Sequence, residues 1–253
     1  MKTLDNHFEN YINANNNTLH PKLESIYNKL PDRLNDIPNL ILYGPSGVGK
    51  YKQALQIINK YSPSNLKYEK KISLLFNKNN YTYKISDVHL EVDMDLLGCN
   101  SKQLWHEIYN NYVDIVSAKS QHHGIILCKN FQDIHSELLD LFYSYMQKLP
   151  VSYYDIKFIL ITEQLSFIPD NICNSSYVIN IPRPSKSQYM KNINKPIASN
   201  KIDNIKYILL ELNINTNKTL IDRLYNAVIN NEFSFSEVRE ILYDVFIYNI
   251  NVY

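Results

Sequence analysis

The chain has 253 residues, of which 45% are hydrophobic and 20% are charged. This length and composition predict one large domain, or a domain with a small satellite, built on a real hydrophobic core. Lysines and arginines number 26 against 25 acidic residues, so the formal net charge is +1. That balance excludes a global electrostatic attraction to nucleic acid or to membranes.

The three cysteines, Cys99, Cys128 and Cys173, are odd in number and show no CxxC spacing. We therefore expect neither a disulfide framework nor a zinc site. We expect the three thiols to be reduced, as in an intracellular protein. The N-terminus lacks the apolar core of a signal peptide, and no apolar run reaches the length of a membrane span. We expect an intracellular protein, in nucleus or cytoplasm, with no membrane partner. The abundance of Asn, Lys, Ile and Tyr is typical of an AT-rich genome, as in some viruses.

The first part of the chain alternates helices and strands. Residues 1–20 form an Asn-rich segment, and apolar residues at helical spacing predict a helix over 21–30. An alternating pattern around Asn77-Lys78-Asn79-Asn80 predicts a β-hairpin, inserted at about 70–87 on the edge of a larger sheet. Ser101 is the expected N-cap of a following helix. The further predicted elements are strands at 39–43 and 89–92, a helix ended by Pro63, and a helix at 101–116.

The segment between strand 39–43 and the helix before Pro63 is the most informative one. It reads Gly44-Pro45-Ser46-Gly47-Val48-Gly49-Lys50. Strand, glycine-rich loop and helix in this order are typical of a P-loop, whose backbone N–H groups surround nucleotide phosphates. Lys50 would contact the β- and γ-phosphates, and the helix N-terminus would favour their charge. The next residue, where a Ser or Thr hydroxyl would hold Mg²⁺, is Tyr51, whose phenol is too long for that contact.

The second half of the chain continues the alternation and then becomes all-helical. Strands at 124–128, 156–161 and 177–181 and a helix at 134–149 complete a parallel α/β sheet covered on both faces. Pro182-Arg183-Pro184-Ser185 marks the boundary near residue 184. We predict a P-loop domain over 21–184 and a small helical domain over 185–253. Its candidate helices lie at 185–194, 201–212, 217–230 and 235–249.

The parts needed to hydrolyse a nucleotide are missing from the expected positions. A P-loop ATPase carries a metal-organising acid at the end of its third core strand and a neighbouring Glu as general base. Here Lys129 and Asn130 stand at those positions. A cation repels Mg²⁺, and an amide does not accept a proton at neutral pH. We therefore expect nucleotide binding without catalytic residues, with ATP or ADP as ligand and a doubtful role for Mg²⁺.

The order of these segments resembles the small subunits of the sliding-clamp loader replication factor C, which are AAA+ proteins. The resemblance covers about residues 20 to 250. It implies that Thr162, or Glu163, lies at a polar sensor position and that Arg239 lies near the γ-phosphate. It also implies other clamp-loader subunits, the sliding clamp and, through the assembly, primer-template DNA as partners in replication. The matching segments are Ile37–Lys50, His89–Asp93, Phe158–Thr162, Tyr177–Ser185 and Glu237–Leu242.

The departures from the family are equally informative. The family's Ser-Arg-Cys motif, which supplies an arginine finger, corresponds to Cys173-Asn174-Ser175-Ser176, so Ser175 replaces the arginine. A basic pair of the family corresponds to Tyr143-Ser144, and we expect this chain to lack the family's collar domain. In this family the sliding clamp contacts this module, and the helix 134–149 with its preceding loop (Phe131, Ile134) is the expected place for that contact, unless these apolar residues belong to the core.

Two other interpretations stay open from the residues. The first is an active P-loop ATPase, such as a helicase loader or motor, that takes its acid from Glu91, Asp93 or Glu163. The second is a replication scaffold that uses no nucleotide and keeps Lys50 and the glycines as relics. A metal site at His122-His123 is not expected, because no third ligand is near in sequence.

Overall fold

A computed structural model describes residues 18–77, 79–147 and 153–193, together with Phe8, Ile12, Tyr225, Asn226, Ile229 and Arg239. The chain divides into two compact units, residues 1–194 and 195–253. The helices predicted at 201–212, 217–230 and 235–249 fall almost wholly outside the described residues, as does most of the Asn-rich segment.

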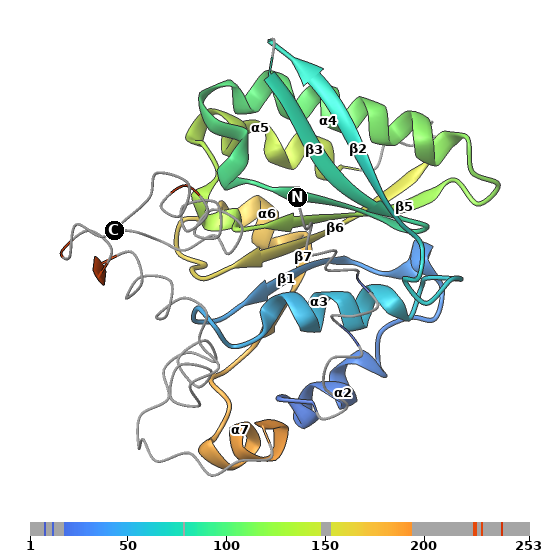
Figure 1. Cartoon of the computed structure of the whole chain (residues 1–253). Helices are drawn as coiled ribbons and strands as arrows, with labels where there is room; N and C mark the ends of the chain where they lie inside the picture. The colour runs from blue at the N-terminus through green and yellow to red at the C-terminus, as the bar shows by residue number, and fades with distance from the viewer. Residues whose placement is uncertain are drawn as a thin grey trace. The chain divides into compact units, whose positions relative to one another are not determined.

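The first unit is built around one seven-stranded sheet of order β2-β3-β4-β5-β6-β1-β7 (Figure 1). Five strands, β4, β5, β6, β1 and β7, pair in parallel, and β2 and β3 extend the sheet in antiparallel fashion. The predicted parallel five-stranded α/β sheet is therefore confirmed. The strands are β1 Asn39–Tyr43, β2 Glu69–Phe76, β3 Asn79–Ser86, β4 His89–Asp93, β5 His123–Lys129, β6 Asp155–Thr162 and β7 Ser176–Asn180.

Helices cover both faces of this sheet. On one face, α4 (Ser101–Ser117) and α5 (Ser136–Met146) pack against one apolar cluster; on the other, α2 (Pro21–Tyr27) and α3 (Lys50–Asn59) pack against a second (Figure 1). Within β1, Ile41 belongs to the first cluster, and Leu40 and Leu42 to the second. Burial on both faces explains why the parallel strands are continuous apolar runs. The remaining elements are α6 (Asp170–Asn174), α7 (Lys186–Ile193) and 3-10 turns at Leu34–Asp36, Asp95–Asn100 and Phe131–Asp133.

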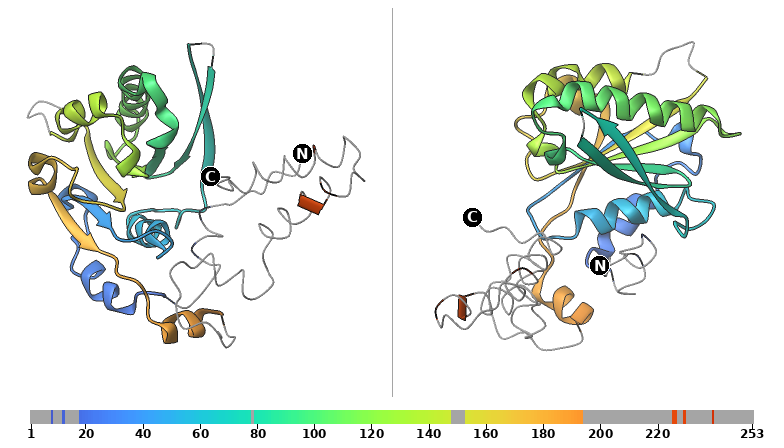
Figure 2. Two further views of the ribbon diagram at one scale, coloured as in Figure 1. Left: turned by 90° about the vertical axis from the view of Figure 1, so that its left-hand side faces the viewer. Right: turned by 45° about the horizontal axis from the view of Figure 1, so that its top comes forward.

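The β2–β3 hairpin is present where the sequence predicted it, at the edge of the sheet (Figure 2). Its connection is shorter than expected, because Phe76 pairs directly with Asn79 and the second strand begins there. Asn77 adopts φ 48°, a left-handed conformation that asparagine tolerates better than most residues. The hairpin is therefore a tight two-residue turn.

Two details at helix starts differ from expectation. The N-cap of α4 is Asn100; Ser101 is the first helical residue, and its buried hydroxyl oxygen has no hydrogen-bond partner among the described residues. The helix expected from 134 begins at Ser136, because Ile134 still has extended backbone after the preceding 3-10 turn. Neither helix has a side-chain cap hydrogen bond. None of the described helices is long and apolar enough to cross a bilayer.

A histidine is fully buried on β4. His89 Nδ1 lies 2.6 Å from the Ser86 hydroxyl oxygen, and its ring lies 4.8 Å from the ring of Phe8. Burial lowers the pKa of His89 to about 3, with Asp87 opposing the change and Lys119 adding to it. The imidazole is therefore neutral in the folded protein at neutral pH.

This histidine should make the stability of the fold sensitive to acid. Because the pKa is lower in the folded protein than its ordinary 6.5, the unfolded chain binds the proton more tightly. The contribution is fully present above pH ~6.5 and is lost as the pH falls toward ~3, by up to about 5 kcal/mol. Urea unfolding of the wild type and of His89→Asn at neutral and acidic pH measures this loss.

We expect His89→Asn to lose less stability than the wild type over that interval. The control is His135→Asn, which removes an exposed imidazole. An equal acid loss in the wild type and His89→Asn would show that His89 does not carry the effect.

Candidate functional site

The loop Gly44–Lys50 leaves the carboxyl end of β1 and is fixed by its neighbours on both sides. Gly44 donates its N–H to Thr162 O at 3.3 Å, and Ile181 donates to Tyr43 O at 2.8 Å. A Cβ at Gly44 would lie 2.2 Å from the backbone oxygen of Ile181, so no larger residue fits there. Gly47 and Gly49 adopt φ 69° and 88°, which only glycine adopts without strain. Sequence and backbone geometry thus agree on a tight phosphate-type loop.

The loop opens directly into α3. Gly49 is the N-cap of this helix, and its first turn contains no acidic residue. The first N–H groups of a helix have no partner within it, and with the helix dipole they attract an anion. The start of α3 therefore presents positive potential to the space bounded by the loop.

The side chain of His20 contacts the backbone of the loop at Val48. The sequence motif alone does not indicate this contact. The Nε2 of His20 lies 2.8 Å from the backbone oxygen of Val48, which is itself buried. Burial lowers the pKa of His20, and the contact with Val48 partly offsets this. A neutral imidazole that donates from Nε2 satisfies the Val48 carbonyl and holds the loop in place.

Lys50 turns back toward its own loop. Its ammonium donates to Gly44 O at 2.7 Å and to Pro45 O at 2.8 Å, and it lies 3.6 Å from Glu163 Oε1. The side chain is nearly buried, which lowers its pKa, while Glu163 acts in the opposite direction. An ammonium has three N–H donors, and these three oxygens are their partners. Among the residues that the structure describes, Glu163 is its one charged partner, and this carboxylate is 42% exposed.

A second group of charges lies beside Tyr51. The ammonium of Lys129 lies 3.7 Å from Glu91 Oε2, 3.9 Å from Asp93 Oδ2, and 5.6 Å from the centre of the Tyr51 ring. Asn130 donates from Nδ2 to Asp93 Oδ1 at 2.9 Å. We call Tyr51, Glu91, Asp93, Lys129 and Asn130 the Lys129 cluster. The structure thus brings Lys129 and Asn130, predicted from the sequence, together with Glu91 and Asp93, two of the three acids considered for an active enzyme.

The other predicted site residues are placed less directly. Thr162 is buried, and its hydroxyl donates to Gln164 O at 2.7 Å, so Glu163 is the residue of this pair that contacts Lys50. Ser175 is exposed and donates to Ile172 O at 3.0 Å. Arg239 is exposed, and its surroundings fall outside the described residues. Ser46 is exposed on the loop.

Of the two interpretations left open for Phe131 and Ile134, the core is confirmed, so these two residues offer no clamp-binding surface. Their exposed fractions are 0% and 9%, and both belong to the core against α5. Phe131 packs edge-on against Phe142 with ring centres 5.0 Å apart. They are buried because the 3-10 turn at Phe131–Asp133 and the residue after it pack in the same apolar cluster as the buried side chains of α5. On α5 itself, Leu141 is the large apolar side chain that reaches solvent, at 38% exposed.

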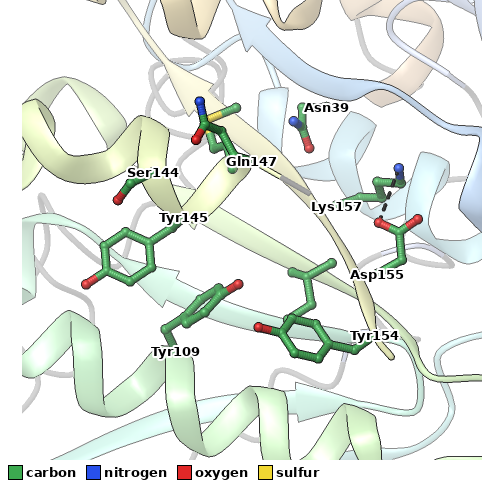
Figure 3. Close-up of a pocket in the computed structure, with 10 residues that line it drawn as sticks. Asn39, Tyr109, Ser144, Tyr145, Gln147, Tyr154, Asp155 and Lys157 are labelled. Atoms are coloured by element: carbon green, nitrogen blue, oxygen red, sulfur yellow. Dashed lines mark ion pairs between the residues drawn. The ribbon is translucent and has the colours of Figure 1, made fainter. Parts of the chain in front are cut away.

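A separate hollow lies near the opposite ends of the strands. Tyr109, Tyr145 and Tyr154 line it together with the ion pair Asp155–Lys157 (Figure 3). Its volume is about 160 Å³, below the roughly 300 Å³ at which ligand pockets begin. Ligands of open α/β sheets bind at the carboxyl ends of the strands, where the loop lies. The loop and the Lys129 cluster are therefore the candidate site.

Comparison with known proteins supports part of the resemblance. No family model matches the chain. The sequence is 21% identical over 236 residues to replication factor C subunit 5 of Saccharomyces cerevisiae, covering 87% of this chain and 66% of that protein. The chain thus spans slightly less than two thirds of that relative. The similarity is in line with a clamp-loader-like AAA+ protein.

Solved structures show more distant likeness. A variant of Thermotoga maritima RuvB gives a TM-score of 0.39 at 11% identity, covering 74% of this chain and 49% of that one. Saccharomyces cerevisiae RIF2 gives a TM-score of 0.44 at 13% sequence identity, and the match covers 88% of this chain and 74% of that one. TM-scores below 0.5 carry no argument for the fold, so the fold assignment depends on the strand order of the sheet and on the loop Gly44–Lys50.

The contact between Glu163 and Lys50 generates a prediction about anion binding. An anion that approaches Lys50 competes with this carboxylate, so Glu163→Gln should bind ATP about two- to tenfold more tightly than the wild type. The partial exposure of Glu163 keeps the effect modest. Fluorescence titration with a labelled ATP measures it, and Glu107→Gln on α4, an exposed acid, is the control. Weaker binding by Glu163→Gln would mean that Glu163 assists the ligand instead.

Proposed function

We propose that this chain is a clamp-loader-like AAA+ module that binds ATP or ADP and has lost efficient hydrolysis. One observation carries the proposal: the loop Gly44–Lys50 keeps the close approach at Gly44 and the positive φ at Gly47 and Gly49, while Lys129 ends strand β5 and Asn130 follows it. The N–H groups of the loop and of the first turn of α3 would hold the phosphates. Lys50 would exchange Glu163 or a loop carbonyl for a phosphate oxygen.

The loss of hydrolysis follows from the residues around that loop. Hydrolysis needs a group that orients or deprotonates the attacking water and a cation that neutralises developing charge. Asn130 donates its amide to Asp93 and has no basic atom to offer. Asp93 and Glu91 are both held by Lys129. Removing even one such catalytic group typically costs orders of magnitude in rate.

An assembly role is the natural use of a module that binds without turnover. The sequence similarity to a replication factor C subunit supports other clamp-loader subunits as partners, and through them the sliding clamp and primer-template DNA in the compartment where DNA is replicated. Ser175 at the arginine-finger position means that this chain would receive, and not supply, catalytic groups at its interfaces. Co-purification with clamp-loader subunits tests this assembly.

One observation favours an active ATPase as the second candidate. Glu163 reaches the Lys50 ammonium, so a carboxylate does stand where it could accept a proton from water near a γ-phosphate. Glu163 is, however, paired with the Lys50 ammonium, so binding without turnover is the better supported function.

The binding claim depends on Lys50. Lys50→Ala removes the ammonium that neutralises phosphate charge, so affinity for ATP and ADP should fall by about tenfold or more. Isothermal titration of purified protein measures the change, and Lys102→Ala on α4, an exposed lysine, should bind as the wild type does. Absence of nucleotide binding by the wild-type chain would favour a nucleotide-independent scaffold.

A further inference from the structure

The residues around the loop do not fit the magnesium ion that accompanies nucleotides in P-loop proteins. Mg²⁺ requires oxygen ligands at about 2.0–2.1 Å in octahedral geometry, normally one or two carboxylates plus phosphates and water. The place of the loop hydroxyl is taken by Tyr51, whose ring faces an ammonium at 5.6 Å.

The acids that could have served as ligands already have a cation. Lys129 lies within 4 Å of a carboxylate oxygen of both Glu91 and Asp93, and Asn130 donates to the other oxygen of Asp93. Glu91 is only 4% exposed in its side chain, and its second oxygen, Oε1, is buried with no hydrogen-bond partner among the described residues. The charge of Glu91 is therefore balanced by Lys129. A divalent cation would have to displace that ammonium and would be repelled by it.

Tyr51 and Lys129 fit each other as a pair. The cation lies over the aromatic face, an attractive arrangement, and Tyr51 directly follows Lys50 at the start of α3. The Tyr51 side chain thus links the phosphate loop to the Lys129 cluster. The two departures from the P-loop pattern, at residues 51 and 129, form one contact in the folded chain.

We propose that the Lys129 ammonium replaces the divalent cation, so that this chain binds nucleotide without Mg²⁺. The proposal rests on the nucleotide binding inferred above and specifies the form of nucleotide that the site takes. Lys129 provides a fixed positive charge over the Tyr51 ring, next to the start of α3, and it offsets one of the two negative charges of Glu91 and Asp93, which reduces their repulsion of the phosphates.

The test is the affinity of the wild-type chain for mant-ATP with excess Mg²⁺ and with EDTA. The proposal predicts two dissociation constants that agree within about threefold. Binding that is more than about threefold weaker in EDTA would overturn it while leaving nucleotide binding intact. No binding in either condition would refute the proposed function, and this inference with it. The comparison needs no variant, so it does not depend on the folding of a mutant.

A variant tests the role of the ammonium itself. Lys129→Met keeps the apolar stem and removes the charge, so affinity in EDTA should fall by about tenfold or more. Lys84→Met is the matched control: Lys84 is 30% exposed against 31% for Lys129, and it pairs with Glu69 Oε1 at 3.0 Å, another carboxylate with little exposure. Its affinity should equal that of the wild type. If Lys129→Met, folded as judged by its melting curve, binds in EDTA as the wild type does, the proposal is wrong.

Discussion

The parallel pairing around β6 is the constraint on which the candidate site depends. Tyr43 on β1 is in register with Thr162 on β6, so the loop that follows β1 emerges beside Glu163. Asp93 on β4 is in register with Lys129 on β5, so the ends of these strands meet at the same edge. Parallel strands bring all their carboxyl ends to one edge, and this single fact assembles a charged site from residues far apart in the sequence.

The two lysines of that site are held in different ways, and the difference separates their roles. Lys50 pairs with Glu163, a carboxylate that is 42% exposed, and with loop carbonyls. Such a contact is weak and exchangeable. Lys129 pairs with Glu91, which is 4% exposed, and removing a partner from a buried charge is costly. Lys50 is therefore free to change partners for a ligand, whereas Lys129 is fixed as part of the structure.

The sequence predicted the strands and the loop because their signals are local. Leu40–Leu42 and Ile125–Cys128 are continuous apolar runs, as buried parallel strands require, and the loop is a contiguous motif. The contacts of His20 and the Tyr51–Lys129 pair were not predicted, since they join segments far apart in the chain. For the same reason the sequence left Phe131 and Ile134 open between core and surface, because the pattern of an apolar side chain is the same whether packing buries it or leaves it exposed.

The central claim, a nucleotide site without turnover, is tested most directly by following ATP bound to the protein. Radiolabelled ATP is mixed with excess purified chain and Mg²⁺, and samples are quenched at increasing times. The account predicts that the bound ATP is lost no faster than ATP in buffer. Conversion of the bound ATP to ADP that is abolished in Lys50→Ala would contradict the claim and would indicate an active ATPase.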